Sequence, residues 1–328
     1  MRGTTAGVLR TAAAAVLLAA LGASGPGRAA NGAAVQSPWG ASYFPNVALV
    51  TQDGKQVRFF DDLIRDKVVA INFIFTGCSA SCSMETARLR QVQDLLSDRM
   101  GKDVFFLSIT IDPDNDTPEA LKHYAGKFDT GPGWTFLTGD RQDIDLLRRK
   151  LGLYMPPLKS GQPGTDHDLS LVIGNQATGR WMKASPMENP EVLATQIGSW
   201  LHNWKVVARN PNPSYADAPT RLPQFTRGEE LFRTRCASCH TFGVAAGSPA
   251  SVRAIGPDLA GVARSRPRAW LARWLKEPDV MLAEKDPQAV ALFQKYNRVT
   301  MPNFQLTAAD VTELLSFMDA KDAAIAAK

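Results

Sequence analysis

The sequence predicts an exported chain of two domains, in which an α/β domain precedes an all-α domain. Strand-like and helix-like segments alternate from residue 40 to 205, whereas only helical patterns occur from 226 to 322. A proline-rich stretch separates the two parts, and 328 residues exceed what one hydrophobic core usually supports. The content of 45% hydrophobic and 21% charged residues is typical of a globular protein.

Residues 1–30 have the pattern of an export signal. A basic start with Arg2 and Arg10 precedes an apolar run at 12–21 and a stretch of small residues. This run is shorter than the roughly 20 residues that span a bilayer, so we expect cleavage and a periplasmic location. Membrane association would then arise only through a partner or an uncleaved signal. Loss of Arg2, Arg10 and Arg28 lowers the formal net charge from +5 to +2, so no nucleic-acid partner is expected.

The first domain, residues 40–205, is predicted to contain a central sheet flanked by helices. Apolar runs rich in β-branched and aromatic residues mark strands that are buried on both faces. Thr117 and Pro118 are suited to the start of a helix. The expected elements are strands at 68–76, 103–111 and 134–139, helices after the first two strands, a helix at 143–153, and a hairpin at 169–183 that turns at 175–179.

Four prolines between residues 206 and 225 predict an extended linker before the second domain, residues 226–322. Thr226 can cap a helix that runs toward the cysteines of "CASCH". Thr307 and Asp310 form a capping-box pattern before an amphipathic C-terminal helix. The tryptophans at 270 and 274 share one helix face, where core packing is expected.

The "CASCH" segment fits the C-x-x-C-H pattern of covalent haem attachment. Cys236 and Cys239 would each add to a vinyl group of haem c, and His240 would reach the iron. A methionine thioether is a common sixth ligand of electron-transfer haems. Met301 is the best candidate because Pro302 can hold its loop against the haem, and the alternatives are Met281 and Met318.

The second domain resembles class I cytochrome c domains. The segments that carry the resemblance, in order and spacing, are "GEELFRTRCASCH", "GPDLAGV" at 256–262 and "MPNFQLTAADVTELLSFM" at 301–318. The resemblance implies His240 and Met301 as axial ligands and places Pro257 near the histidine. It implies exchange of electrons with other carriers. The long stretch between the two ligands indicates an insertion around 276–297.

Cys78 and Cys82, in "FTGCSASC", lie between a predicted buried strand and a predicted helix. The N-terminus of that helix would stabilise a thiolate. Thiolates select Cu(I), and two of them four residues apart can hold one metal ion or close into a disulfide. From these residues alone, a copper site and a redox pair both remain open.

A third ligand for copper has to come from elsewhere in the chain. Of the four histidines, His240 is assigned to haem, and His123 and His202 are expected at the surface. His167 follows a Gly/Pro-containing loop and precedes a strand, so it is the leading candidate. The flanking Asp166 and Asp168 could orient its imidazole.

The first domain resembles the SCO/SenC family of copper-binding proteins with a thioredoxin-like fold. The resemblance rests on the segments "KVVAINFIFTGCSASC", "SITIDPDNDTPEALKHYAGKF", "FLTGD" and "DHDLSLVIG". It implies that Cys78, Cys82 and His167 bind one copper ion. Ser79 and Ser83 stand where many members of the family have proline, and this departure leaves the metal affinity and the redox potential open.

The sequence therefore predicts a copper-binding, haem-carrying protein that assembles the copper centre of cytochrome c oxidase. The resemblance implies the copper-centre subunit of the oxidase as partner, served by copper delivery or by reduction of its cysteines. The haem could transfer electrons to the copper or to the dithiol. Two alternatives remain: a thiol-disulfide oxidoreductase acting on oxidase cysteines through Cys78 and Cys82, and a respiratory electron carrier whose first domain only docks.

Overall fold

The computed structural model describes residues 39–78, 81–155, 169–202, 224–245, 248 and 254–327. The predicted signal, the predicted linker between 206 and 223, and His167 lie outside the described residues. Among the described residues, no helix combines the length and the apolar character needed to cross a bilayer. The α/β part and the helical part are treated separately below.

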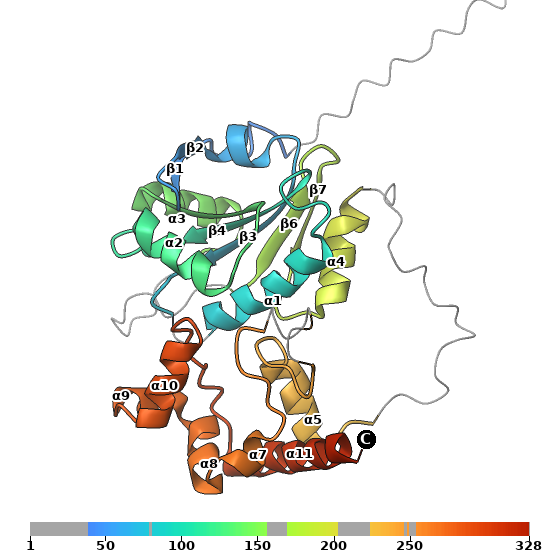
Figure 1. The fold of residues 1–328 in the computed structure, drawn as a ribbon. Coiled ribbons are helices and arrows are strands. Elements are labelled where there is room, and N and C mark those ends of the chain that lie inside the picture. The colour runs from blue at the N-terminus through green and yellow to red at the C-terminus, as the bar shows by residue number, and fades with distance from the viewer. Residues whose placement is uncertain are drawn as a thin grey trace, which may run out of the picture. The chain divides into compact units, whose positions relative to one another are not determined.

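The α/β part is built on a seven-stranded sheet with the order β2-β1-β5-β4-β3-β6-β7 (Figure 1). The three central strands β5, β4 and β3 run parallel, and the outer pairings are antiparallel. The strands are β1 Ala48–Thr51, β2 Gln56–Arg58, β3 Val68–Ile74, β4 Val104–Thr110, β5 Trp134–Gly139, β6 Leu171–Asn175 and β7 Arg180–Ala184. This mixed sheet with helices on both faces is a thioredoxin-like α/β fold.

Helices cover both faces of this sheet, which explains why the central strands are apolar throughout. Alternate residues of β3 point to opposite faces: Ala70 packs in the core under α1, α2 and α4, and Ile71 packs in the core under α3. The helical segments are η1 Phe59–Ile64, α1 Ser81–Leu95, α2 Pro118–Lys127, α3 Arg141–Lys150, α4 Pro190–Gly198 and η2 Trp200–His202.

The parallel ladder of β3 and β4 aligns their carboxyl ends at one edge of the sheet. The ladder pairs Val68 with Val104 and continues to Ile74 opposite Thr110. The loop that carries Cys78 leaves β3 at this edge. The antiparallel pairing of Ile71 with Val172 brings the start of β6 to the same edge. The cysteine loop and the chain entering β6 therefore meet at one end of the sheet.

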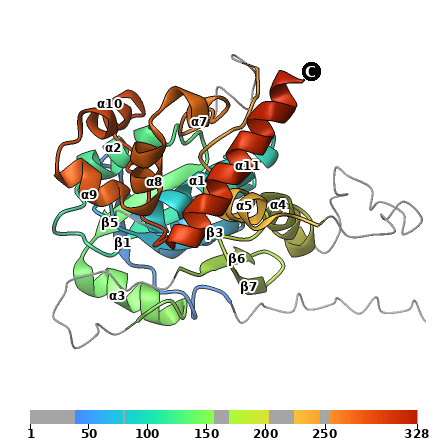
Figure 2. The same cartoon turned by 90° about the horizontal axis from the view of Figure 1, so that it is seen from below.

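The second part of the chain is all-α. Its core consists of apolar side chains from the first and last helices and α8, among them Leu231, Leu271, Leu314 and Met318. Figure 2 shows the long α11 crossing the short α5. The helical segments are α5 Arg227–Leu231, η4 Phe232–Cys236, α7 Val262–Ser265, α8 Arg268–Lys276, α9 Pro278–Ala283, α10 Pro287–Lys295 and α11 Ala308–Ala326.

The helix starts follow the predicted capping residues. The Thr226 side chain accepts a hydrogen bond from the Glu229 amide at the start of α5. Thr307 and Asp310 form the complete capping box at the start of α11. In α2, the Thr117 side chain accepts from the Ala120 amide, and Pro118 occupies the first turn. These predictions are confirmed.

Two expectations need correction. The strand expected at 68–76 is β3, and it ends at Ile74. The Thr76 amide donates to the Asp116 carboxylate instead of to a neighbouring strand. His202 is not a solvated surface residue: its side chain is 17% exposed, and its ring contacts the Arg99 guanidinium. Burial and the positive charge of Arg99 lower the pKa of His202. His123 is exposed, as predicted.

Gly228 sets the distance between α5 and α11. A β-carbon at this position would lie 2.1 Å from the Glu313 carbonyl oxygen and 2.8 Å from Cβ of Phe317. We expect Gly228→Ala to separate the helices and destabilise the second domain by about 1–3 kcal/mol, as other overpacked cores are. Thermal unfolding of the holoprotein, followed by haem absorbance, measures this loss. Gly126→Ala is the control, because its β-carbon meets nothing within 4 Å; equal midpoints for the two variants would contradict the prediction.

Candidate copper and haem sites

The structure brings Cys78 and Cys82 together at the carboxyl end of β3. Cys82 lies in the first turn of α1, and its backbone amide donates to Sγ of Cys78 over 3.4 Å. The Cys78 amide in turn donates to the Phe75 carbonyl over 3.2 Å. Cys82 is fully buried, and Cys78 is partly exposed. Cys82 therefore lies in the core, and Cys78 lies between the core and the surface.

The environment of Cys82 keeps its thiol protonated. A hydrogen bond with the Cys78 side chain, followed by burial, raises the pKa of Cys82, and only the Phe75 backbone opposes this rise. The Cys82 amide, which donates to Sγ of Cys78, places the two cysteines side by side. Two neighbouring cysteine thiolates can hold one soft cation between them.

A buried polar row lies beneath the cysteine pair. Glu85, one turn after Cys82, is fully buried, and its Oε1 accepts from the Asn72 amide group over 2.9 Å. Oδ1 of Asn72 accepts from the Ser108 hydroxyl, which accepts in turn from the Trp134 indole. Buried polar side chains that are joined in this way hold α1 in one position over the sheet.

His167 lies outside the described residues, so its predicted place beside the cysteines stays a prediction. Leu169 and Ser170 are the first described residues after it, at the sheet edge from which the cysteine loop leaves. In the described part of the chain, no three His, Cys, Asp or Glu side chains gather as a metal site. Ser83 is buried in the first turn of α1, and Ser79 lies outside the described residues.

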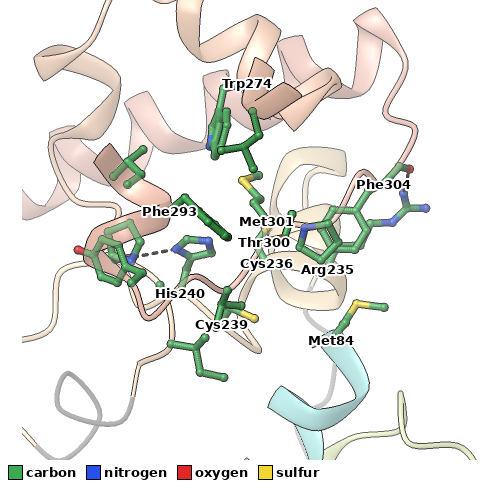
Figure 3. Close-up of a pocket in the computed structure, with 18 residues that line it drawn as sticks. Met84, Arg235, Cys236, Cys239, His240, Trp274, Phe293, Thr300, Met301 and Phe304 are labelled. Atoms are coloured by element: carbon green, nitrogen blue, oxygen red, sulfur yellow. Dashed lines mark hydrogen bonds between the residues drawn. The ribbon is translucent and has the colours of Figure 1, made fainter. Parts of the chain in front are cut away.

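The helical part gathers the four residues predicted to hold haem around one pocket (Figure 3). Cys236 ends η4, and the amides of Cys239 and His240 both donate to its carbonyl over 3.0 Å, which closes a compact turn. Met301 lines the same pocket from the loop before α11. Its walls are largely apolar, and include Ile255, Pro257, Trp274, Leu292, Phe293, Tyr296 and Phe304.

The imidazole of His240 is held in a single orientation. Its Nδ1 donates to the Pro257 carbonyl over 2.9 Å, which leaves Nε2 as the free ligand atom. Gly256 lies flat against the ring: a β-carbon there would come within 2.5 Å of Cε1 and 2.7 Å of Nδ1. Burial lowers the pKa of His240, so the neutral, metal-binding form is favoured. Pro257 thus lies where the sequence places it.

Asp258 joins the two loops on either side of His240, and sequence reasoning did not single it out. Its carboxylate accepts from the Thr241 hydroxyl and from the amides of Gly243, Val244 and Ala260 at 2.7–3.2 Å. Burial alone would raise the pKa of Asp258, but these hydrogen bonds outweigh it and lower the pKa below its usual value. An aspartate after Gly-Pro, at the start of a turn, was the available signal.

The methionine candidates differ in their surroundings. Met281 is buried in α9 and does not line the pocket. Met318 packs in the core of the helical part, although it also lines a second hollow beside His240. Met301 lines both hollows and is followed by the buried Pro302. Met301 as the sixth ligand stays a prediction.

The predicted insertion at 276–297 forms α9 and α10. Asp286 caps α10 and accepts from the Trp270 indole over 3.1 Å, which joins the insertion to α8. Leu292, Phe293 and Tyr296 then form one wall of the pocket. Two cysteines, an oriented imidazole, a thioether and apolar walls are the donor set and lining that a c-type haem needs, so the residues fit the group.

Comparison with known proteins follows the same division of the chain. The sequence profile of SCO1/SenC matches residues 40–202, and the profile of cytochrome c matches 225–321. An SCO2-like protein of Rickettsia typhi is 32% identical over 162 residues, which cover 47% of this chain and 74% of the relative. The chain belongs to the SCO1/SenC family.

Other known proteins match one of the two domains each. The SCO1 homologue of Bacillus subtilis is 36% identical over 92 residues, so this chain spans less than half, 46%, of that relative. The solved structure of Bradyrhizobium japonicum ScoI with copper bound is 26% identical and covers 46% of this chain and 94% of its own, with a TM-score of 0.40. The cytochrome c domain of a Pseudomonas putida protein is 55% identical over 29% of this chain and 88% of its own, with a TM-score of 0.26.

In this SCO1/SenC protein, Gly256 is the position where the fit around His240 can be tested. Gly256→Ala would force the imidazole or its loop to move, at a cost of about 1–3 kcal/mol. We expect a lower thermal midpoint for the holoprotein and a smaller fraction of low-spin haem in its absorption spectrum. Gly126→Ala is the control, because it adds the same β-carbon where nothing lies within 4 Å. A normal spectrum together with a normal midpoint would show that the loop tolerates the β-carbon.

Proposed function

We propose that this SCO1/SenC protein is a periplasmic copper carrier that assembles the copper centre of cytochrome c oxidase. Copper is its cargo, bound as Cu(I) by Cys78 and Cys82 with His167 as the third ligand. The observation that supports this most directly is the contact of the Cys82 amide with Sγ of Cys78, with Cys82 buried and Cys78 partly exposed, at the edge where β6 begins. A buried sulfur retains a soft cation, and an accessible one can pass it to an acceptor thiolate.

A haem c in the second domain is the second part of the proposal. Cys236 and Cys239 would attach it, and His240 and Met301 would be its axial ligands. The Pro257 carbonyl fixes the imidazole, and the walls of the pocket exclude water from it. When bound, such a haem supplies one electron at a time, which matches the one-electron couple of copper better than the two-electron couple of a disulfide.

Copper transfer to an apo copper-centre domain of the oxidase tests the first part. The full chain loaded with Cu(I) should deliver one ion, measured by metal analysis after separation of the two proteins. His167→Ala should lower the Cu(I) affinity by about tenfold or more, because one of three ligands is lost. His123→Ala is the matched control, since His123 is exposed on α2. Equal affinity and transfer by both histidine variants would reject His167 as a ligand.

The second candidate function, thiol-disulfide reduction of oxidase cysteines, is favoured by the same closeness of the two sulfurs. In that reaction the Cys78 thiolate attacks the substrate disulfide, and Cys82 resolves the mixed disulfide, which transfers two electrons and leaves a disulfide in this chain. It needs Cys78 and does not need His167. Disulfide reduction that is lost in Cys78→Ser and intact in His167→Ala, without metal transfer, would favour the reductase over the carrier.

Electron exchange within one chain tests the link between the two parts. The ferrous, Cu(II)-loaded protein should reduce its copper at a rate that does not change with protein concentration. The comparison is a mixture of two full-length variants, one lacking Cys78 and Cys82 and the other lacking Cys236 and Cys239, which can react only between molecules. We expect slower, concentration-dependent reduction in the mixture. Equal rates for the two samples at micromolar concentration would mean that the fusion does not serve electron transfer.

A further inference from the structure

The loop that carries Cys78 is fixed by a carboxylate from another part of the chain. Asp116 is 1% exposed and immediately precedes Thr117, the N-cap of α2. Its Oδ2 accepts from the Thr76 amide over 3.1 Å, and its Oδ1 accepts from the Thr76 hydroxyl. Oδ2 also accepts from the hydroxyl of Thr110, the last residue of β4. One buried carboxylate thus joins the cysteine loop, the end of β4 and the start of α2.

Each of these donors would be costly to leave without an acceptor. The Thr76 amide lies just beyond the ladder of β3, so Asp116 supplies the acceptor that the next strand would otherwise provide. The carboxylate itself is buried, and hydrogen bonds to a charged acceptor are stronger than those between neutral groups. The position of Thr76 relative to β4 is therefore strongly fixed.

Fixing Thr76 also fixes the residue before it, which contacts both cysteines. The Phe75 carbonyl accepts from the Cys78 amide, and the Phe75 backbone forms a hydrogen bond with the Cys82 thiol. Thr76 lies between Phe75 and Gly77, and Gly77 is exposed and is followed by the partly exposed Cys78. A shift at Thr76 would therefore change the separation of the two sulfurs.

We propose that Asp116 is a positioning residue for the Cys78–Cys82 pair: through Thr76 it holds the two sulfurs at the spacing that retains Cu(I). The expected effect on Cu(I) affinity rests on the proposed copper function, and the link from Asp116 to the cysteine loop rests on the hydrogen bonds. Asp116 does not contact the metal and acts only through the loop. Outer groups that orient metal ligands usually change the affinity by about 10–100-fold when they are replaced.

Asp116→Asn in the full-length holoprotein is the direct test. The amide keeps the size of the carboxyl group, but it places N–H donors against the amide and hydroxyl donors of the loop. The matched control is Asp114→Asn, which removes the same charge from the same segment, where Asp114 is 74% exposed and pairs with Arg141. Thr76→Val removes the hydroxyl group of this side chain, whereas Thr76→Ser retains it.

Two readouts separate positioning from a merely structural role. Cu(I) affinity is measured by equilibrium dialysis against a Cu(I) chelator with metal analysis, and the dithiol–disulfide midpoint is measured against glutathione without copper. We expect Asp116→Asn to weaken Cu(I) binding by about tenfold or more relative to Asp114→Asn, and to shift the midpoint. Thr76→Val should weaken binding in the same direction, with recovery in Thr76→Ser.

The outcomes distinguish this inference from the copper function itself. If wild type and Asp114→Asn bind Cu(I) and Asp116→Asn matches them in affinity and midpoint, the positioning role is wrong. If wild type shows no Cu(I) binding that depends on Cys78, the copper function fails. The dithiol–disulfide midpoint then decides alone whether Asp116 positions the two cysteines. Should Asp116→Asn not fold, the Thr76 pair decides: equal affinity and midpoint for Thr76→Val and Thr76→Ser would overturn the proposal.

Discussion

The parallel pairing of β3 with β4 is the constraint on which the cysteine site depends. Seven residue pairs from Val68 to Ile74 align the two strands, and the Ile111 amide extends the ladder by donating to the Ile74 carbonyl over 2.8 Å. Because parallel strands need a crossover, the chain must leave β3 through a loop and return by a helix. That loop carries Cys78, and the crossover helix α1 carries Cys82. The parallel connection therefore explains why one cysteine lies in a loop and the other in the first turn of a helix.

In both parts of the chain, an aspartate carboxylate holds a loop at the candidate site. The loop has backbone N–H groups that belong to no strand or helix, and a buried or half-buried aspartate accepts hydrogen bonds from them. Asp116 does this for the cysteine loop, and Asp258 does it for the loop after His240. In both places the carboxylate also accepts from a threonine hydroxyl on the functional loop. In both places the hydrogen bonds of one carboxylate restrain a loop that regular secondary structure does not hold.

Much of this could be predicted from the sequence because the signals are local. The buried strands, the caps at Thr117, Thr226 and Thr307, and the "CASCH" turn each depend on neighbouring residues. The partners of Asp116 and the packing of His202 depend on residues brought together by the sheet, and no spacing in the sequence reveals them. Gly256 belongs to the same class, since its closeness to the His240 ring arises only when two loops meet. Tertiary contacts, rather than weak propensities, limited the prediction.

Closeness of two sulfurs does not by itself select copper over disulfide chemistry, since both need it. What can select is a third donor at the same edge and an electron source that works in single steps. The register of Ile71 with Val172 brings the chain that follows His167 to the cysteine edge. Covalent joining to a haem domain would replace encounter between separate molecules with electron transfer inside one chain. A one-electron donor in the same chain would match the one-electron reduction of a bound Cu(II) better than the reduction of a disulfide, which needs two electrons.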